Sequence, residues 1–599
     1  MKKITLLFVV VFCATTCLNV VGQDKAKWAK YLGGDAAISP EMSHTGDASI
    51  NNVVLKNNHL YVNGYYSITG CWNGVALPED IGVNGMVSKL DLDGNVIWTS
   101  TITGISFPNN FTDIAVDSQG DVVATGWASS YWEPGDCKIN GEVVIPFHED
   151  ENVMWETFNK GFVAKFSGVD GSLVWFEYWE TDREVFTTRI TLDENDNIYL
   201  AGHTWGNYGP SSIMIGDMEF AIPSKYSENL LYFKMNSNGK CQWIKTLEGV
   251  EVEELWGEDQ AYMNPRSIIH NNGKLYIGMN YYGTITINET TLPFSEAIGG
   301  HMCAILEINA TNGAITNFTT FGGVKSEQSI ARLKCDSNGN IIAVGYYYLI
   351  DGFKVGDITL TGTATADHED AFVAKFDNNL NVLWAKSIGG NYNDRAFNVT
   401  VTENDFISIG GGFDPASPFH YGGTALTESR PTGLSLFQLL INGQGEAVDL
   451  HTLYVLDGHS TYTNSETVIE TSTKRMFSVG NWLGDANLLD PTGEPITEDH
   501  SKGFVMEWHR GIISSVESYE KENFSLSAYP NPVADQLRIM LGNSSNPISV
   551  VIRNTAGMQV LNTSISNGQT INLQSLASGL YLISVSDGTV EHVSKIVKQ

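Results

Sequence analysis

Four arginines stand where guanidinium groups could converge on an anion. Arg189, Arg266 and Arg332 hold nearly the same position in successive copies of an internal repeat, and Arg395 lies close to that position in the next copy. Asp113 takes the equivalent place in an earlier copy. The planar fork of a guanidinium matches a carboxylate or a sulfate. The alternative is pairing with neighbouring acids, because the chain has 68 Asp and Glu against 35 Lys and Arg.

Aromatic residues form a second set of ligand candidates. They follow, directly or within a few residues, a glycine that recurs in every copy of the repeat. Rings of this kind stack on sugar faces while nearby short polar groups satisfy hydroxyls. The alternative is that the rings fill the wedges between neighbouring repeats. The candidates chosen for ligand contact are Trp127, Trp205, Tyr281, Tyr346 and Trp482.

The repeat itself is visible in "DIAVDSQGDVVATGW" at 113–127 and "RLKCDSNGNIIAVGY" at 332–346. The sequence of each copy predicts two short strands joined by a turn of Asp, Asn or Gly residues. The second strand is expected to end on a glycine. The intervals between these glycines are 62, 76, 76, 67, 65 and 70 residues. The glycines are Gly64, Gly126, Gly202, Gly278, Gly345, Gly410 and Gly480.

A second hairpin, typified by "AFVAKFDNNLNVLWAKSIGG" at 371–390, lies between the first ones, so that each unit becomes a four-stranded antiparallel sheet. Such sheets bury their faces when packed radially. The chain therefore predicts an all-β, seven-bladed β-propeller. "KWAKYLGG" at 27–34 reads as a fourth strand without its partners, and "GFVMEWHR" at 503–510 as a third strand with no successor. We expect these two strands to pair and close the ring, which removes an exposed sheet edge.

The connections of each unit divide between two faces. The turns within the two hairpins are tight, whereas the connections between hairpins are long and lie together on the opposite face. Long loops on a rigid scaffold often carry binding residues. We therefore expect a ligand site on the long-loop face.

The two ends of the chain carry export signals. Lys2 and Lys3 precede an apolar run, which predicts a signal peptide over 1–22. The tail contains "SAYPNP" and "SGLY" among short alternating strands, and predicts a small β-sandwich after a polar joint. The expected organisation is a signal peptide at 1–22, a propeller at 23–511, a linker at 512–523 and a C-terminal domain at 524–599.

Two family resemblances accompany these patterns. Residues 26–510 resemble the seven-bladed propeller repeats of secreted bacterial proteins. Residues 524–599 resemble the C-terminal sorting domain of type IX secretion, whose marks include the motif Tyr529, Pro530, Asn531 and Pro532. This second resemblance implies passage across the outer membrane by the type IX machinery. It also implies removal of the tail and attachment to the cell surface or release.

Charge, apolar stretches and cysteines limit the classes of partner and site that the chain can have. The net charge of −33 argues against nucleic acid, which needs clustered Lys and Arg. No stretch after the signal peptide is apolar enough for a transmembrane segment. Five scattered cysteines remain in the mature chain, and we expect buried free thiols instead of disulfides or a metal site. They are Cys71, Cys137, Cys241, Cys303 and Cys335.

Motifs of catalysis and metal binding are weak. No GxSxG, HExxH or Walker motif occurs, so we assign no catalytic residue, cofactor or metal. The turns "DLDGN" at 91–95 and "DSNGN" at 336–340 are typical of hairpins. The acid and histidine clusters at 147–151, 367–370 and 498–500 read as solvated loops.

The sequence thus favours an exported binding or adhesion module whose ligand is a glycan or a protein. One alternative is a glycan hydrolase or lyase, because two catalytic acids can come from different blades. Another alternative is a structural component of a surface layer.

Overall fold

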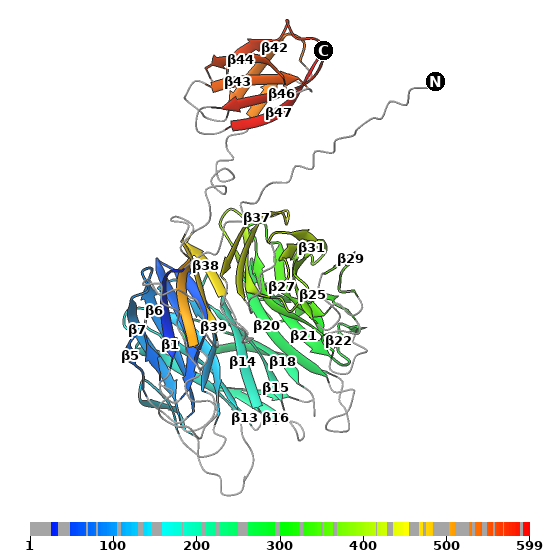
Figure 1. Cartoon of the computed structure of the whole chain (residues 1–599). Helices are drawn as coiled ribbons and strands as arrows, with labels where there is room; N and C mark the ends of the chain where they lie inside the picture. The colour runs from blue at the N-terminus through cyan, green and yellow to red at the C-terminus, as the bar shows by residue number, and fades with distance from the viewer. Residues whose placement is uncertain are drawn as a thin grey trace. The chain divides into compact units, whose positions relative to one another are not determined.

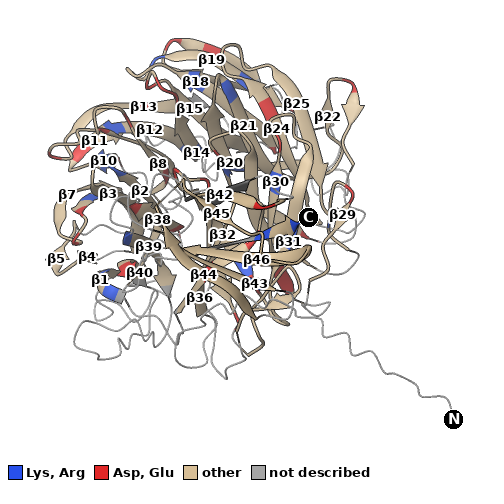
Figure 2. Cartoon of the chain, turned by 90° about the horizontal axis from the view of Figure 1, so that it is seen from above, with Lys and Arg blue, Asp and Glu red and all other residues tan. Residues whose placement is uncertain are grey.

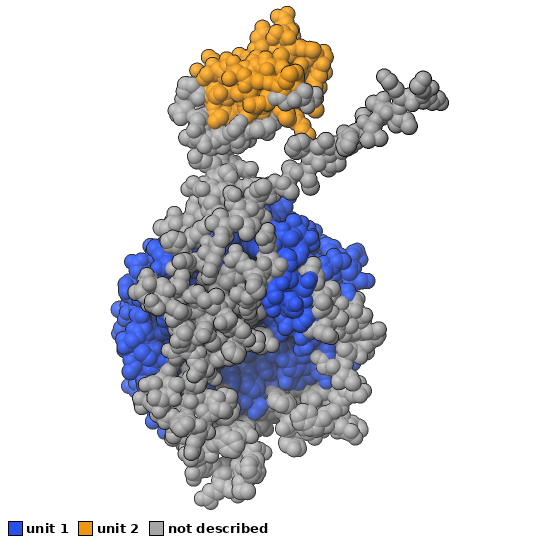
Figure 3. All heavy atoms as spheres, in the orientation of Figure 1, with its two compact units in different colours: residues 1–511 blue, residues 512–599 orange. Residues whose placement is uncertain are grey.

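In the computed structural model, the described residues form β-strands joined by turns and loops, and none of these residues is helical. These are 26–33, 48–67, 70–78, 82–104, 109–129, 136–146, 159–181, 184–205, 211–222, 228–249, 261–293, 300–323, 327–348, 352–362, 368–414, 416–427, 435–453, 466–470, 475–482, 502–508, 526–529, 533–541, 548–554, 558–566, 568–586 and 591–599. The predicted signal peptide and Pro530 to Pro532 lie outside them. Contacts divide the chain into two units, residues 1–511 and 512–599 (Figure 3).

The sheets of the first unit repeat one antiparallel pattern of four strands. The first strands are β2 (Ala48–Lys56), β8 (Asn110–Val116), β14 (Glu184–Leu192), β20 (Tyr262–Asn271), β26 (Gln328–Cys335), β32 (Arg395–Val401) and β38 (Glu466–Glu470). The second strands are β3 (His59–Ser67), β9 (Val122–Ala128), β15 (Ile198–Trp205), β21 (Lys274–Tyr282), β27 (Ile341–Tyr348), β33 (Ile407–Phe413) and β39 (Arg475–Trp482).

The third and fourth strands complete each group. The third strands are β6 (Val83–Asp91), β12 (Lys160–Phe166), β18 (Asn229–Met235), β24 (Met302–Asn309), β30 (Glu369–Phe376), β36 (Ser435–Ile441) and β40 (Lys502–Trp508). The fourth strands are β7 (Val96–Thr103), β13 (Leu173–Thr181), β19 (Cys241–Leu247), β25 (Ile315–Phe321), β31 (Val382–Gly389), β37 (Ala447–Leu453) and β1 (Ala26–Gly33).

The first strands surround an axis. Each contacts the first strand of the next group, and β38 contacts β2, so the series is closed. Figures 1 and 2 show these strands toward the middle of the unit and the later strands outside. The predicted pairing of the two chain ends is confirmed, because β1 pairs with β40 through contacts such as Tyr31 with Phe504.

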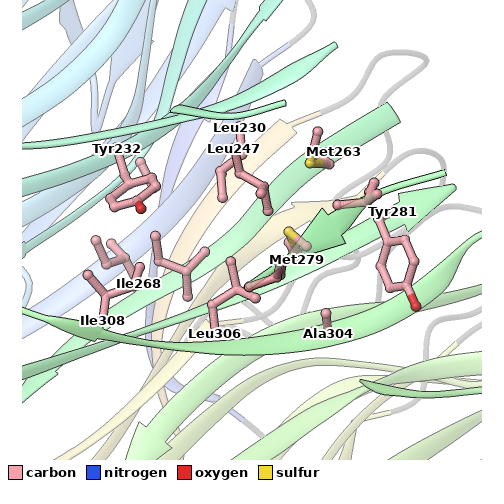
Figure 4. Packing of buried hydrophobic residues seen from close by; sticks show 14 of the residues in the cluster. Leu230, Tyr232, Leu247, Met263, Ile268, Met279, Tyr281, Ala304, Leu306 and Ile308 are labelled. Atoms are coloured by element: carbon pink, nitrogen blue, oxygen red, sulfur yellow. The ribbon is translucent and has the colours of Figure 1, made fainter. Parts of the chain in front are cut away.

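Apolar side chains fill the space between neighbouring sheets. Figure 4 shows one such cluster, in which Leu230 and Tyr232 of β18 face Met263 of β20 and Leu306 of β24. Alternate residues of a strand point to opposite faces, so each sheet contributes to the cores on both of its sides. Each sheet is thereby held by its two neighbours.

Tryptophans of five fourth strands pack against a turn glycine of the next group. A Cβ built on Gly94 would lie 2.7 Å from the Trp28 ring, and one on Gly445 would lie 3.0 Å from the Trp384 ring. Both glycines occupy tight turns with φ near +78°, a conformation that side chains rarely adopt. The turn glycine therefore serves both the backbone and the packing of the neighbouring tryptophan.

Short hairpins occupy the long connections, and they were not predicted. They are β4 (Cys71–Trp72) with β5 (Val75–Ala76), β10 (Cys137–Ile139) with β11 (Glu142–Ile145), β16 (Ser211–Ile215) with β17 (Met218–Ile222), β22 (Thr286–Ile287) with β23 (Thr290–Thr291), β28 (Lys354–Val355) with β29 (Ile358–Thr359), and β34 (His420–Tyr421) with β35 (Thr424–Ala425). β4, β10, β16 and β34 each extend the preceding sheet by pairing with its fourth strand. The signal was present, since Asn73-Gly74 and Asn140-Gly141 are typical turn pairs of two-residue hairpins.

The repeat glycines do not end their strands. Gly126 lies within β9 and pairs with Phe111, next to a β-bulge in β8. A Cβ on Gly126 would lie 1.9 Å from the Asn110 carbonyl oxygen, so the glycine permits the close approach of the two strands. In β9, Gly126 pairs with the residue just before the bulge of the first strand. The residues that pair in this way in β21 and β33 are Met279 and Gly411, each one residue after the predicted Gly278 and Gly410.

The second unit contains two antiparallel sheets that share one apolar core. One has the order β41-β42-β45 and the other β44-β43-β46-β47. The strands are β41 (Leu526–Tyr529), β42 (Gln536–Leu541), β43 (Ile548–Asn554), β44 (Gln559–Ile565), β45 (Thr570–Asn572), β46 (Gly579–Ser586) and β47 (Glu591–Lys598). Of the predicted sorting motif, Tyr529 ends β41.

Candidate functional site

A β-bulge near the middle of six first strands sets which side chains point to the axis. The residue that follows the bulge is Asn52, Asp113, Arg189, Ser267, Arg332 or Asn398. The common register expected for Asp113, Arg189 and Arg332 is therefore observed. Arg266 is itself the bulged residue of β20, one position earlier. Its side chain consequently does not follow the direction of the other two.

Arg189 and Arg332 are engaged within the protein. The Arg189 Nε and the Arg332 Nη1 both donate to the carbonyl oxygen of Arg266, the latter over 3.3 Å. Arg332 also donates to the side chain of Asn52, and its Nε lies 3.6 Å from the Glu466 Oε1. These contacts join β14, β20, β26, β2 and β38. The guanidinium groups of Arg189 and Arg332 form a layer of cross-links around the axis, which we call the arginine layer. Arg332 pairs with the acid Glu466, whereas Arg189 donates to carbonyl oxygens of the backbone.

Burial changes the ionisation of this layer. Burial and the positive charge of Arg332 lower the pKa of Arg189 to about 9. Burial raises the pKa of Glu466, although Arg332 acts in the opposite direction. Both charges thus depend on their partners, because a buried ion loses its hydration.

A cavity of about 320 Å³ lies on the side of this layer toward the tight turns. Arg332, Glu466 and Asp113 contribute to its lining, as do Lys56, Lys334 and Asp193 nearer the turns. It contains both charge signs, and Lys56 already donates to the Val116 carbonyl oxygen over 2.8 Å. The cavity does not lie on the long-loop face, where we expected the site.

Arg395 and Tyr346 contact each other. Arg395 donates to both carboxylate oxygens of Glu369, over 2.7 Å for the Nη2 contact, and its guanidinium lies 4.5 Å from the centre of the Tyr346 ring. Glu369 is almost fully buried. This bidentate pair uses the fork that we had assigned to a ligand.

The predicted aromatic contacts differ in their surroundings. Tyr281 is fully buried and its hydroxyl donates to the Pro293 carbonyl oxygen, so its ring cannot form a surface for a sugar (Figure 4). The prediction for Tyr281 is wrong, because the side chain faces the core between two sheets. Trp127 is half-buried at an edge-on contact with Phe186, 5.2 Å between ring centres. Trp205 and Trp482 end β15 and β39, and their side chains lie outside the described part.

A cluster of polar groups lies at the long-loop end of the sheet that begins with β14. Phe186 pairs with His203, and their rings stack with 4.9 Å between centres. Glu184 is on the same face of the sheet, because it lies two residues before Phe186. Glu228 immediately precedes β18, and its Oε2 lies 3.9 Å from the His203 Nε2. Sheet register thus brings Glu184, His203 and Glu228 together.

The neighbouring strand β20 adds a tyrosine and the displaced arginine. The backbone N–H of Glu228 donates to the Ala261 carbonyl oxygen, next to Tyr262. The Tyr262 hydroxyl accepts a hydrogen bond from Asn264 over 2.8 Å, and its ring makes an edge contact with His301 at 5.0 Å. The positive charge of Arg266 acts to lower the pKa values of His203, His301 and Tyr262. We call Glu184, His203, Glu228, Tyr262 and Arg266 the loop-end cluster.

Three buried atoms of this cluster have no hydrogen-bond partner among the described residues. They are the His203 Nδ1, the Glu228 Oε2 and the Arg266 Nε. The side chains of His203 and Glu228 are only 12% and 16% exposed. A buried polar atom without a partner is costly, so such atoms commonly mark a place where a ligand or water binds.

The carboxyl groups of the cluster differ in environment. Burial and the nearby charge of Glu184 raise the pKa of Glu228 to about 7. Burial also raises the pKa of Glu184, but a hydrogen bond from Asn159 favours its ionised form. Burial and the charge of Arg266 lower the pKa of His203 to about 4, so this ring is neutral beside Glu228. Burial and charge thus favour the protonated form of Glu228 near neutral pH, whereas the hydrogen bond from Asn159 opposes the effect of burial at Glu184.

Another buried acid lies at the start of β32. Asp394 is fully buried and accepts hydrogen bonds from the backbone N–H groups of Gly390 and Asp414. Burial and the charge of Asp370 nevertheless raise its pKa well above the usual value. The ionised form is therefore disfavoured in the folded protein.

A pH-dependent stability difference follows from Asp394. Its raised pKa contributes stability below the unfolded pKa of about 3.9, and this contribution is lost as pH rises through the folded pKa. As pH rises from about 4 to 7, we expect the free energy of unfolding of Asp394→Asn to increase relative to that of the wild type. Urea denaturation at both pH values measures the difference. A difference that does not change with pH would contradict it.

The side chains whose spacing is similar to that of metal ligands form hydrogen bonds with other groups of the protein. In the turn at 91–95 the Asp91 carboxylate accepts hydrogen bonds from the backbone of Asp93 and Asn95. The expectation of solvated loop residues at 367–370 is wrong for Glu369 and Asp370, because both begin β30 and are buried. The His368 Nδ1 lies 3.3 Å from the Asn393 Oδ1. The segments 147–151 and 498–500 are outside the described residues. Within the described part, no three His, Cys, Asp or Glu residues are grouped as metal ligands.

The five described cysteines are free. Cys137 and Cys303 are buried as expected, and burial raises the pKa of the Cys241 thiol to about 11. Cys71 is exposed, because it lies in the hairpin that extends the sheet at β1, so the expectation of burial is wrong there.

Comparisons with known proteins identify two segments. Residues 527–599 match the secretion system C-terminal sorting domain, and residues 175–209 match a β-propeller repeat. An uncharacterised WD repeat-containing protein of Acanthamoeba polyphaga mimivirus is 22% identical over 351 residues, which are 52% of this chain and 24% of that protein. The chain thus spans about a quarter of the length of that relative.

Solved structures show only distant likeness. A polysaccharide lyase that acts as an ulvan lyase has 10% identity and a TM-score of 0.37, with 80% of this chain and 97% of that chain covered. The endosialidase of phage phi92 has 10% identity and a TM-score of 0.33, with 94% and 79% covered.

In the described part, no helix has the length and apolar character to cross a membrane. The sorting domain indicates export and interaction with the secretion machinery. The chain is therefore an all-β protein with a β-propeller repeat and a C-terminal sorting domain of type IX secretion, and it is directed to the cell surface or the medium.

Proposed function

We propose that this protein is an exported binding module that recognises a carboxylated glycan at the long-loop end of its ring. The observation that carries the proposal is the convergence of three buried, unpartnered polar atoms in the described part of the loop-end cluster. The Arg266 Nε can donate to a carboxylate, and the His203 Nδ1 and Glu228 Oε2 can bond to sugar hydroxyls. Trp127 and Phe186 supply adjoining aromatic surface.

We also propose a blade architecture and an export route for this chain. Each four-stranded group is one blade, so the ring has seven blades closed by strands from both ends of the chain. The two sheets of the second unit form a small sandwich, and the domain bounds are 23–511 and 524–599. The signal peptide at 1–22 leads to the periplasm, from which the sorting domain directs passage across the outer membrane.

Arg266→Ala is expected to weaken binding of a carboxylated glycan by about 10- to 100-fold, the value of one charged hydrogen bond. The wild-type full chain, Arg266→Ala and Arg538→Ala are compared on a glycan array, and affinities for retained glycans are measured by calorimetry. Arg538 is an exposed arginine of the second unit and serves as the control. The control is expected to bind as the wild type does.

Two results would contradict the proposal. Equal affinity of the wild type and Arg266→Ala would remove Arg266 from the site. A blank array would favour a protein ligand or a structural role, the alternatives that the sequence leaves open. Intrinsic fluorescence confirms that Arg266→Ala is folded before binding is measured, and circular dichroism does so for Arg538→Ala, because the tryptophans lie between residues 28 and 508.

A further inference from the structure

We propose that the loop-end cluster also cleaves the bound glycan by hydrolysis, with Glu228 as the general acid and Glu184 as the general base. This inference rests on the proposed function, because the substrate must first bind at the same cluster. It adds an activity and names its catalytic residues. The substrate class is a polysaccharide that carries carboxylated sugars, for which Arg266 is the recognition group.

The arrangement of strands sets the separation of the two acids. Glu184 belongs to β14 and Glu228 adjoins β18, and β15 lies between them. Two strand spacings amount to about 10 Å between backbones. Glycosidases that place a water molecule between the base and the sugar have carboxyl groups about 6.5 to 9.5 Å apart. The reach of the two glutamate side chains can bring carboxyl groups on backbones about 10 Å apart into this range, so we infer a single displacement by water, which inverts the configuration at the anomeric carbon.

The environments assign the two roles. Glu228 is nearly buried, has a neutral histidine beside it, and its Oε2 has no hydrogen bond within the described residues. These features favour its protonated form. Glu184 accepts a hydrogen bond from Asn159 and lies beside a group that keeps its own proton. An acid and a base of different proton affinity at one site is the pattern that glycoside hydrolysis requires.

Hydrolysis by this pair of acids takes place in one step. The Glu228 carboxyl proton moves to the glycosidic oxygen, and the bond between that oxygen and the anomeric carbon breaks with its electron pair on the oxygen. Water attacks the anomeric carbon from the opposite side and gives a proton to the Glu184 carboxylate. The products are two saccharides, one with a new reducing end, and proton exchange with solvent restores both carboxyl groups.

The test uses the full chain with polygalacturonate, alginate and hyaluronan as separate substrates. Reducing ends are measured together with ultraviolet absorbance, and binding is measured by calorimetry. We expect reducing ends without unsaturated product for at least one polymer. Glu228→Gln and Glu184→Gln should each lower the rate by about 100- to 10,000-fold, the contribution of a positioned acid or base. Both variants should still bind the polymer.

Glu219→Gln provides a control, because Glu219 is an exposed glutamate of the hairpin β16–β17, which lies in the chain between β15 and β18 and extends the sheet of β13. Its rate should equal that of the wild type. The wild-type rate should fall as pH rises through about 7, where Glu228 loses its proton. Glu228→Gln should not show this fall in its residual rate.

The outcomes separate this inference from the proposed function. Binding without reducing ends overturns hydrolysis and leaves the binding module intact. Unsaturated products or a retained anomeric configuration also overturn it, because they require a different reaction or a covalent intermediate. Absence of both binding and cleavage rejects the two proposals together.

Discussion

Replacing Arg332 with methionine is expected to lower the free energy of unfolding of the first unit by about 3 to 5 kcal/mol, the usual cost of leaving a buried charge without its partner. Arg332 contacts Asn52, Glu466 and the carbonyl oxygen of Arg266, and its side chain is 14% exposed. Without the guanidinium, Glu466 retains a carboxylate in a nearly buried site. The strands that meet at the axis also lose a shared donor.

Urea denaturation followed by tryptophan fluorescence measures this effect. All 14 tryptophans lie between residues 28 and 508, so the signal reports on the first unit. Lys274→Met removes a comparable ion pair with Glu307, but Lys274 is 42% exposed, and we expect a loss of at most about 1 kcal/mol. Adding Glu466→Gln to Arg332→Met should recover part of the loss. Equal losses for the single and the control variants would contradict a structural role for the arginine layer.

Gly126→Ala is expected to destabilise the first unit by at least about 3 kcal/mol, at the upper end of overpacking substitutions. The added Cβ would lie 1.9 Å from the Asn110 carbonyl oxygen and 2.9 Å from the Phe162 ring. Both contacts are far inside van der Waals distance, and the first involves backbone. The bulge of β8 would have to move, and with it the position of Asp113 at the axis.

Gly443→Ala is the matched control. At Gly443 an added Cβ would have its nearest neighbours at 3.7 Å, which is ordinary contact, and we expect a change within about 1 kcal/mol. The same fluorescence measurement applies, with the midpoint and slope of each denaturation curve compared. A loss for Gly126→Ala no larger than that for Gly443→Ala would show that the strands tolerate the methyl group.

A one-residue bulge separates arginines that hold strands together, in the arginine layer, from the arginine proposed for ligand recognition, in the loop-end cluster. Arg189 and Arg332 follow their bulges and donate to protein acceptors. Arg266 is the bulged residue, and its Nε has no acceptor within the described part of the chain. A β-bulge redirects a side chain because it adds one residue to a strand of period two. Stability and ligand recognition can therefore reside in neighbouring arginines of one repeat position.

Several local features followed from the sequence. The turns around Asp91 and Asp336, the strands beside them and the pairing of β1 with β40 agree with prediction. These features depend on turn residues and on alternation along a strand, which are properties of short segments. The hairpins with Asn73-Gly74 and Asn140-Gly141 had the same kind of signal, and it was overlooked because the long connections were treated as loops.

The sequence alone therefore determined the strand repeat, its turns, the meeting of the two chain ends and the tail that directs export. Only the tertiary structure decided that Arg332 and Arg395 have protein partners, that Tyr281 is buried, and that Glu184, His203 and Glu228 meet. The physical reason is that side chains from separate strands meet according to register and bulges. A shift of one residue turns a side chain to the opposite face, and this shift leaves the hydrophobic pattern of the repeat nearly unchanged.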